Sequence, residues 1–265
     1  MPKTAVVRID DDIKDILARG TFDGVKYRLP EQLDRSTYNQ ANKILKAVGA
    51  EWARGAKAHV FPSEAAIRDF QQAIGAGELI DRKKTYGQFD TPKILARELV
   101  KMACISTGQR ILEPSAGIGR ICDAIAETGK DVYVEMVEID ADRHELLCDK
   151  YVGNWLAFND DFLNFDPGYV YDRIIANPPF GNSEDAKHVM HMLDLLAHGG
   201  CLVAVMATSI PFRDNGAYAK LKNRLDLEFD YQILNLPMNM FKESGTGVNT
   251  CVLIAEHKTS NISDN

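Results

Sequence analysis

The stretch of sequence that decides the fold is Ile174-Ile175-Ala176-Asn177-Pro178-Pro179-Phe180-Gly181. Its apolar start predicts a buried parallel strand, and the two prolines end that strand because neither has an N–H for the hydrogen-bond ladder. Pro178 also keeps Asn177 out of the helical conformation. Open α/β sheets bind ligands at the carboxyl ends of their strands, so an amide, a carbonyl and the ring of Phe180 are expected there. Two acceptors beside a flat ring suit a planar amino group and the ring that carries it.

Alternating strand and helix patterns surround this stretch. They predict an α/β fold in which helices cover both faces of a parallel sheet. The first helix is expected to begin at Thr91 as its cap, with Pro92 in the first turn. The strands are expected at 110–112, 132–139, 155–158, 173–176, 200–207, 231–236 and 250–255, and the later helices at 119–128, 141–151, 185–197 and 217–225.

The N-terminal part has a different pattern, in which a short strand, a helix capped by Asp34, a hairpin over 51–61 and a helix starting at 62–64 follow one another. Its aromatic residues are numerous enough for a small core of its own. We therefore expect a small α+β subdomain over 1–80, a linker over 81–86, a main domain over 87–258 and a polar tail over 259–265.

Composition limits the class of protein. Of the 265 residues, 45% are hydrophobic and 26% are charged, an ordinary globular balance. There is no run of eighteen apolar residues and no signal-peptide core, and the five cysteines are scattered, so we expect a cytoplasmic protein without a membrane span. Cys104, Cys122 and Cys201 lie in apolar runs and are expected to be structural.

The net charge of −7 argues weakly against nucleic-acid binding by the chain as a whole, but the charge is unevenly distributed. Residues 1–85, however, carry 15 Lys and Arg against 12 Asp and Glu, a net charge of +3, whereas the remaining residues carry 16 and 26. A polyanion is therefore expected to meet the N-terminal part. On the hairpin, Trp52, Arg54, Lys57 and His59 could touch DNA, although Trp52 could equally be core.

A glycine loop over 113–120, Glu-Pro-Ser-Ala-Gly-Ile-Gly-Arg, follows the first strand of the main domain and opens a helix. Its glycines let backbone approach a ligand closely, and the helix start offers N–H groups. Glu113 suits a ligand ammonium group better than a pyrophosphate. The third glycine of a dinucleotide-binding loop is missing, since Cys122 stands there, so a dinucleotide oxidoreductase is disfavoured.

Two further strand ends carry acids. Glu138 fits a role in accepting both ribose hydroxyls of a nucleoside, whereas Asp140 fits a helix cap better. After the next strand, Asp161 could accept from an adenine amino group and Phe162 could lie on the adenine ring. Taken in isolation, these two residues fit a polar loop with one buried phenylalanine better.

Five motifs in order resemble those of the class I S-adenosylmethionine-dependent methyltransferases, and more narrowly the N6-adenine DNA methyltransferases. They are GQFDTP (87–92), EPSAGIGR (113–120), VEID (137–140), DDF (160–162) and NPPF (177–180). The resemblance implies a Rossmann-like seven-stranded sheet, S-adenosyl-L-methionine as cofactor, and methyl transfer to adenine N6 in DNA by base flipping and direct in-line attack.

The resemblance also implies roles for residues. The methionine part of the cofactor would contact Phe89, Thr91 and Glu113, with close approach allowed by Gly117 and Gly119; Glu138 would hold the ribose, and Asp161 and Phe162 the adenine. The catalytic residues would be Asn177, Pro178, Pro179 and Phe180. Phe241 could be a second aromatic against the flipped base, or simply core.

Several alternatives stay open. The same NPPF site could methylate an RNA base or a protein glutamine, or the chain could be a catalytically idle cofactor- or DNA-binding protein. The sequence ends soon after the last strand, so DNA specificity is expected from the N-terminal unit, from the loops over 209–216 and 242–247, or from a specificity partner or a second copy. No metal is expected, because His188 and His191 fit solvated helix residues better than metal ligands.

Overall fold

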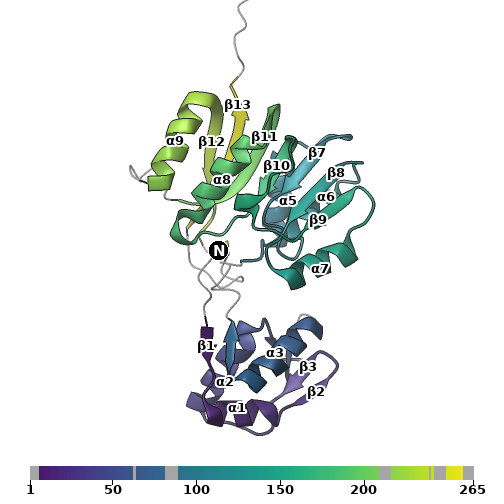
Figure 1. The fold of residues 1–265 in the computed structure, drawn as a ribbon, viewed down its shortest axis with the longest axis vertical. Helices are drawn as coiled ribbons and strands as arrows, with labels where there is room; N and C mark the ends of the chain where they lie inside the picture. The colour runs from purple at the N-terminus through teal and green to yellow at the C-terminus, as the bar shows by residue number, and fades with distance from the viewer. Residues whose placement is uncertain are drawn as a thin grey trace, which may run out of the picture. The chain divides into compact units, whose positions relative to one another are not determined.

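The computed structural model describes residues 6–61, 64–80, 89–208, 216–238, 240–241 and 249–258. The chain forms two compact units, 1–88 and 89–265 (Figure 1). Outside the described residues lie the expected linker (81–86), the polar tail (259–265), the helix start at 62–63, Gly87 and Gln88 of the first motif, and most of the two expected specificity loops. No helix in the described part of the chain is long and apolar enough to span a membrane.

The C-terminal unit is built on a seven-stranded sheet in the order β12-β13-β11-β10-β7-β8-β9 (Figure 1). The strands are β7 (Arg110–Glu113), β8 (Tyr133–Val137), β9 (Trp155–Phe158), β10 (Tyr171–Ala176), β11 (Leu196–Ala207), β12 (Phe229–Asn235) and β13 (Thr250–His257). The prediction of a parallel sheet is wrong for β13, which pairs antiparallel with both β11 and β12. The reason is that β12 and β13 are adjacent strands with no described helix between them to carry the chain back across the sheet.

Helices cover both faces of this sheet (Figure 1). The helices are α5 (Lys93–Met102), α6 (Arg120–Glu127), α7 (Ala141–Lys150), α8 (Glu184–Asp194) and α9 (Gly216–Glu228). One apolar cluster joins the sheet to α5 and α6, and the other joins it to α8 and α9. Ile174 belongs to one cluster and Ile175 to the other, and both are fully buried, so the apolar start of the deciding stretch is a central strand.

The N-terminal unit has a four-stranded antiparallel sheet in the order β2-β3-β5-β4 and a separate pair of strands, β1 and β6. Its core contains Tyr27, Phe61 and Phe70. Asp34 caps α2 as expected, because its side chain accepts from the backbone N–H groups of Ser36 and Thr37. The elements are β1 (Val6–Arg8), α1 (Asp11–Ala18), β2 (Thr21–Asp23), β3 (Lys26–Arg28), α2 (Arg35–Ala47), β4 (Glu51–Ala53), β5 (Ala58–Val60), α3 (Glu64–Ala76) and β6 (Glu78–Ile80).

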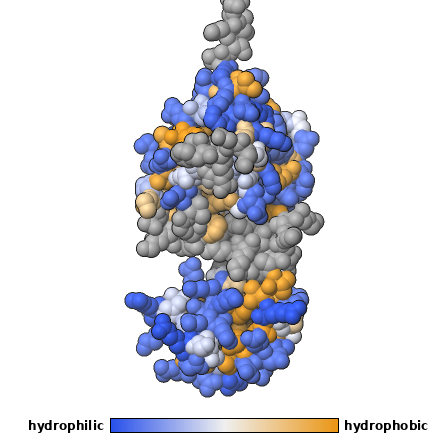
Figure 2. All heavy atoms as spheres, turned by 90° about the vertical axis from the view of Figure 1, so that its left-hand side faces the viewer, coloured by the Kyte–Doolittle hydropathy of each residue, from blue (hydrophilic) through white to orange (hydrophobic). Residues whose placement is uncertain are grey.

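The hairpin of β4 and β5 exposes Trp52, with 49% of its surface accessible, so this residue is not core. Its ring meets the edge of His59 at 5.0 Å. His59 itself is fully buried, so the expectation that it could touch DNA is wrong. Arg54 and Lys57 are exposed at the tip. On the face drawn in Figure 2, polar side chains dominate both units, and apolar side chains gather on part of the N-terminal unit.

Candidate active site

The carboxyl ends of β7, β8 and β10 lie side by side, because β7 pairs with both of the other strands. Glu113 ends β7, Glu138 follows β8 and Asn177 follows β10. Only 2%, 6% and 9% of their respective surfaces are accessible. The order of the strands thus gathers at one edge three buried polar residues that are far apart in the sequence, and α/β sheets bind ligands at this edge.

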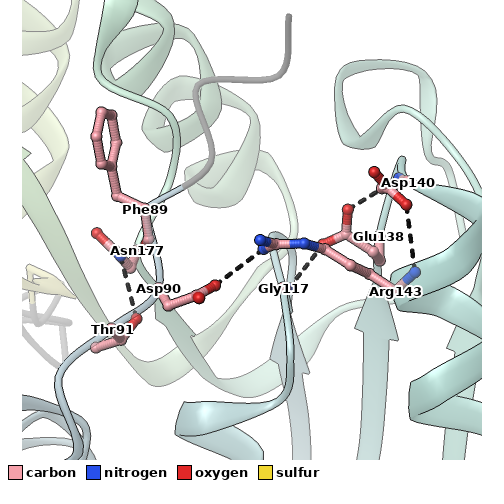
Figure 3. Close-up of polar contacts among 8 residues, drawn as sticks. All are labelled: Phe89, Asp90, Thr91, Gly117, Glu138, Asp140, Arg143 and Asn177. Carbon is pink, nitrogen blue, oxygen red and sulfur yellow. Dashed lines mark hydrogen bonds and ion pairs between the residues drawn. The ribbon is translucent and has the colours of Figure 1, made fainter. Parts of the chain in front are cut away.

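The carboxamide of Asn177 is held by the loop before α5 (Figure 3). Its Nδ2 donates to the Phe89 carbonyl at 3.0 Å and to Thr91 Oγ1 at 3.1 Å. Thr91 therefore does not cap the helix as expected; Pro92 stands at the cap position, and the Thr91 hydroxyl is turned to Asn177. Asn177 Oδ1 is buried and has no hydrogen-bond partner among the described residues. Because both N–H groups of the amide are engaged, its orientation is fixed and its oxygen is presented as an acceptor.

Phe180 is half-buried in a row of three rings. Its ring stacks on Phe89 with centroids 6.3 Å apart and planes 29° apart. On another side, the ring of Phe241 meets it edge-on at 5.8 Å. Phe241 is 1% exposed, so the structure places it in the core beneath Phe180 rather than on an open face. Of the two aromatic candidates, Phe180 has accessible surface for a flat ligand.

The segment after Phe180 contains features that the sequence did not indicate. Asn182 and Ser183 have φ angles of 55° and 60°, in the left-handed region that non-glycine residues rarely adopt. Asp185 ties the start of α8 to its surroundings, because it accepts from the Ala207 N–H at 3.0 Å and from the Tyr218 hydroxyl at 2.7 Å. Such strained backbone persists where the surrounding structure holds it, commonly near functional sites.

The glycine loop and Glu138 are bonded to each other. Glu138 Oε2 accepts from the Gly117 N–H at 2.7 Å, and Oε1 accepts from the Asp140 N–H at 2.9 Å (Figure 3). Asp140 caps α7 by accepting from the N–H groups of Asp142 and Arg143, in agreement with its expected role. Gly119, at φ 79°, has no room for a side chain, since an added Cβ would lie 2.8 Å from the Tyr151 hydroxyl.

Glu113 is enclosed more completely than the other acids. The Cys122 thiol donates to its Oε2 at 2.6 Å. Burial raises the pKa of Glu113 to about 8, so in the ligand-free protein its carboxyl holds a proton at neutral pH. Cys122 and Cys201 are buried as expected, but Cys104 is exposed, because it stands in the turn just after α5 with φ 47°.

Asp161 and Phe162 follow β9. Asp161 caps the short helix η1 (Phe162–Asn164) by accepting from the Leu163 N–H at 3.1 Å. The ring of Phe162 is 3% exposed and packs on His191 and His188, with centroids 4.8 Å and 5.6 Å away.

The expectation that these histidines are solvated is wrong for His188, whereas 25% of the His191 side chain is exposed. His188 is 7% exposed, and its Nδ1 lies 2.8 Å from the Glu184 carbonyl. His191 Nε2 lies 2.8 Å from the Phe165 carbonyl. Both histidine rings therefore pack against Phe162, a role that their spacing on the helix did not reveal. In the described part of the chain, no three metal-ligating side chains gather together.

These residues fit the groups of S-adenosylmethionine. Glu113 is a buried acid with no described cationic partner within bonding distance, so its carboxyl group is available to an ammonium group of a ligand. Glu138 presents two carboxylate oxygens beside the backbone of a glycine loop at φ 58° and 79°, where a ligand can come close. Asp161 and Phe162 lie on the next strand end, beyond Glu138.

Comparison with known proteins agrees with this geometry. No family model matches the chain. The type II methyltransferase M.TthHB8I of Thermus thermophilus is 32% identical over 111 residues, which is 42% of this chain and 25% of that protein. The methylase subunit of the type I restriction enzyme EcoEI of Escherichia coli is 24% identical over 95% of this chain and 56% of that protein. The chain thus spans between a quarter and about half of the length of these relatives.

A structural relative shows the class of fold. A protein of Listeria monocytogenes assigned to the class I S-adenosylmethionine-dependent methyltransferases superposes with a TM-score of 0.54 and 15% identity, over 87% of this chain and 77% of that one. The chain has the class I S-adenosylmethionine-dependent methyltransferase fold. Its sequence relatives are named as a type II methyltransferase and as the methylase subunit of a type I restriction enzyme, so the resemblance of the motifs to the class I S-adenosylmethionine-dependent methyltransferases is confirmed.

Proposed function

We propose that this protein transfers a methyl group from S-adenosylmethionine to the N6 amino group of adenine in DNA. The observation that carries the proposal is the buried, unpartnered Oδ1 of Asn177 at the carboxyl end of β10. A buried acceptor without a donor is costly, and such a group is retained where a ligand completes it. A planar amino group would supply the missing donor.

The role of Asn177 follows from its fixed orientation. An exocyclic amino group is a weak nucleophile because its lone pair is delocalised into the ring. Asn177 Oδ1 and the adjacent Pro178 carbonyl would accept from its two N–H bonds and favour a tetrahedral nitrogen with a localised lone pair. Since the hydrogen bonds to Phe89 and Thr91 already hold the amide, little reorganisation is needed during the reaction.

Phe180 would hold the base that carries this amino group. An adenine inside a duplex must leave the stack before its amino group can reach a strand end buried in a protein. Phe180 offers a half-exposed ring that Phe89 and Phe241 keep in place from two sides. A flat face of this kind recovers part of the stacking energy that the flipped base loses, about 1–3 kcal/mol.

The remaining residues would hold the cofactor. S-adenosylmethionine supplies an activated methyl group when it is bound. Glu113 would face its ammonium group, and Glu138 its ribose hydroxyls. Asp161 and Phe162 would take its adenine, and Thr91, Gly117 and Gly119 would line the route between these acids.

The choice of DNA over other substrates rests on the relatives, which are named as a type II methyltransferase and as the methylase subunit of a type I restriction enzyme. Methylation of an RNA base or of a protein glutamine is the nearest rival, and an idle binding protein is the next. Methyl transfer from labelled S-adenosylmethionine to duplex DNA, RNA and a protein extract separates these. We expect label in DNA as N6-methyladenine, and label in RNA or protein alone would overturn the substrate assignment.

For the N-terminal unit we propose a role in DNA contact through Trp52, Arg54 and Lys57. All three are exposed on the β4–β5 hairpin. An exposed aromatic ring on the same hairpin as two basic side chains suits a nucleic-acid backbone and its bases. The variant Arg54→Ala/Lys57→Ala should weaken DNA binding most at low salt while leaving cofactor affinity unchanged.

Sequence recognition could also involve a partner. One relative is named as a methylase subunit of a type I restriction enzyme, and its similarity extends over nearly all of this chain. We therefore propose that a specificity partner or a second copy completes site recognition. Long-read sequencing of methylated genomes would first identify the DNA site. Light scattering with and without DNA that contains this site would then measure the mass of the assembly.

A further inference from the structure

One ion pair crosses the candidate cofactor site. Arg143, in the first turn of α7, reaches over the glycine loop to Asp90, where its Nη1 lies 3.0 Å from Oδ1 (Figure 3). An added Cβ at Gly117 would lie 3.3 Å from the same nitrogen, so the guanidinium rests directly against the loop. The two side chains are 22% and 40% exposed.

The guanidinium of Arg143 lies near carboxyl groups other than that of Asp90 (Figure 3). Burial raises the pKa of Glu138, and the positive charge of Arg143 acts in the opposite direction. Glu113 lies at the neighbouring strand end. Against the opposing effect of burial, the cations Lys150 and Arg120 lower the pKa of another acid, Asp123. Lys150 pairs with Asp123 at 2.5 Å on the side of α6. Arg143 is thus a cation that reaches from α7 across the loop into a group of acids.

We propose that Arg143 is the counter-ion for the carboxylate of the cofactor, with Asp90 occupying that place in the ligand-free protein. The inference rests on the proposed function. The amino-acid end of S-adenosylmethionine is a zwitterion, and acids alone match only its ammonium group. A guanidinium beside the glycine loop matches the other half, because it binds carboxylates in a planar, two-pronged geometry.

The exchange of partners is chemically simple. Asp90 and the cofactor both present a carboxylate, so Arg143 keeps one charged partner before and after binding. The pair is partly exposed, so its opening does not leave a charge buried and unpaired. Asp90 would act as a positioning residue that keeps the guanidinium over the loop before the ligand arrives.

The test uses two ligands and the whole 265-residue chain. S-adenosylhomocysteine carries the amino-acid end, whereas methylthioadenosine has the nucleoside part alone. Calorimetry should show that Arg143→Gln weakens binding of S-adenosylhomocysteine by about 10- to 100-fold and leaves methylthioadenosine binding within about twofold. Arg143→Lys should lie between wild type and Arg143→Gln, because a point charge replaces a fork.

A matched control is Arg97→Gln. It breaks a comparable ion pair, Arg97 to Glu127 at 2.7 Å between α5 and α6, and should leave the affinity for both ligands unchanged. Melting temperatures of all variants confirm that they are folded. Equal losses for both ligands in Arg143→Gln, or a gain for both, would overturn the counter-ion role while leaving the proposed function in place. A wild-type protein that binds neither ligand would overturn both.

Discussion

The ends of β8 and β10 hold a buried polar side chain in two different ways. At β8, both carboxylate oxygens of Glu138 already accept hydrogen bonds from backbone N–H groups. At β10, the two N–H groups of Asn177 are engaged, but its oxygen has no described partner. Both residues follow strands of the same sheet and are less than a tenth exposed.

The difference reflects what each residue would do. Glu138 would bind hydroxyls by exchanging or sharing its present bonds, so the ligand-free state is stable by itself. Asn177 would act on an amino group whose geometry must change, so its acceptor is preorganised and left without a partner. A binding residue can be satisfied at rest, whereas a residue that acts in the transition state gains from being kept unsatisfied.

The largest effect is expected from Asn177→Ala. Removal of the preorganised acceptor should lower the single-turnover rate of methyl transfer by about 100-fold or more, as for other preorganised polar groups at reacting centres. Cofactor affinity should hardly change. Asn159→Ala is the control, since Asn159 Nδ2 also donates to strand-end carbonyls, those of Glu138 and Ile139, but faces no reacting group. A fully active Asn177→Ala protein would remove Asn177 from the chemistry.

Glu138→Ala should act on affinity rather than on rate. Two ribose hydroxyls would lose a charged acceptor worth about 1.5–3 kcal/mol per hydrogen bond, so calorimetry should show weaker binding by at least about tenfold. The Gly117 and Asp140 N–H groups would also lose their partner, so the melting temperature of the ligand-free protein should fall. The control Glu135→Ala, within β8, removes the acceptor of hydrogen bonds from the Tyr169 and Tyr171 hydroxyls and should lower stability alone. Equal affinity in wild type and Glu138→Ala would contradict the ribose role.

Thr91→Val tests whether orientation matters at Asn177. The change keeps the shape of the side chain but removes the oxygen that accepts from Asn177 Nδ2 at 3.1 Å. One buried N–H is left without a partner, which costs about 1–3 kcal/mol, and the amide gains freedom to turn. The transfer rate should fall by about tenfold, less than in Asn177→Ala, and Thr91→Ser should restore it. An unchanged rate in Thr91→Val would mean that the Phe89 carbonyl alone fixes the amide.

The smallest effect concerns Glu113, at the strand between the other two. Its pKa of about 8 lies above the ordinary value of 4.5, so the folded protein retains a proton that the unfolded chain releases. The associated stability is fully present below pH 4.5 and is lost as the pH rises towards 8, by about 1.4 kcal/mol per unit. Glu113→Gln removes this dependence, so its melting temperature should fall less than that of wild type between pH 6 and pH 7. If the melting temperatures of wild type and Glu113→Gln changed equally with pH, Glu113 would be ionised in the folded protein and the prediction would be wrong.

The features that could be predicted from the sequence are those that depend on local patterns. The apolar run before Pro178, the Asp34 and Asp140 caps and the β4–β5 hairpin each depend on a few neighbouring residues, and all agree with the structure. The hydrogen bond from Asn177 to Thr91 could not be predicted this way, because it joins residues 86 positions apart.

The remaining errors have related causes. The direction of β13 depends on its connection to β12. The burial of His188 depends on Phe162, which packs against α8 from another part of the chain. The short strands β1 and β6, which no local pattern predicted, pair with each other although they are about 70 residues apart in the sequence. Each of these features is set by distant contacts, which periodicity and capping signals do not contain.

The proline that ends β10 also affects how the protein ages. An asparagine side chain deamidates when the backbone nitrogen of the next residue attacks the carboxamide carbon and closes a five-membered imide. Pro178 has no N–H to lose, so this route is closed at Asn177. Conversion to aspartate would remove both donors to Phe89 and Thr91 and add a negative charge in a buried site. The Asn-Pro order therefore protects the Asn177 carboxamide from this route of deamidation over the lifetime of the molecule.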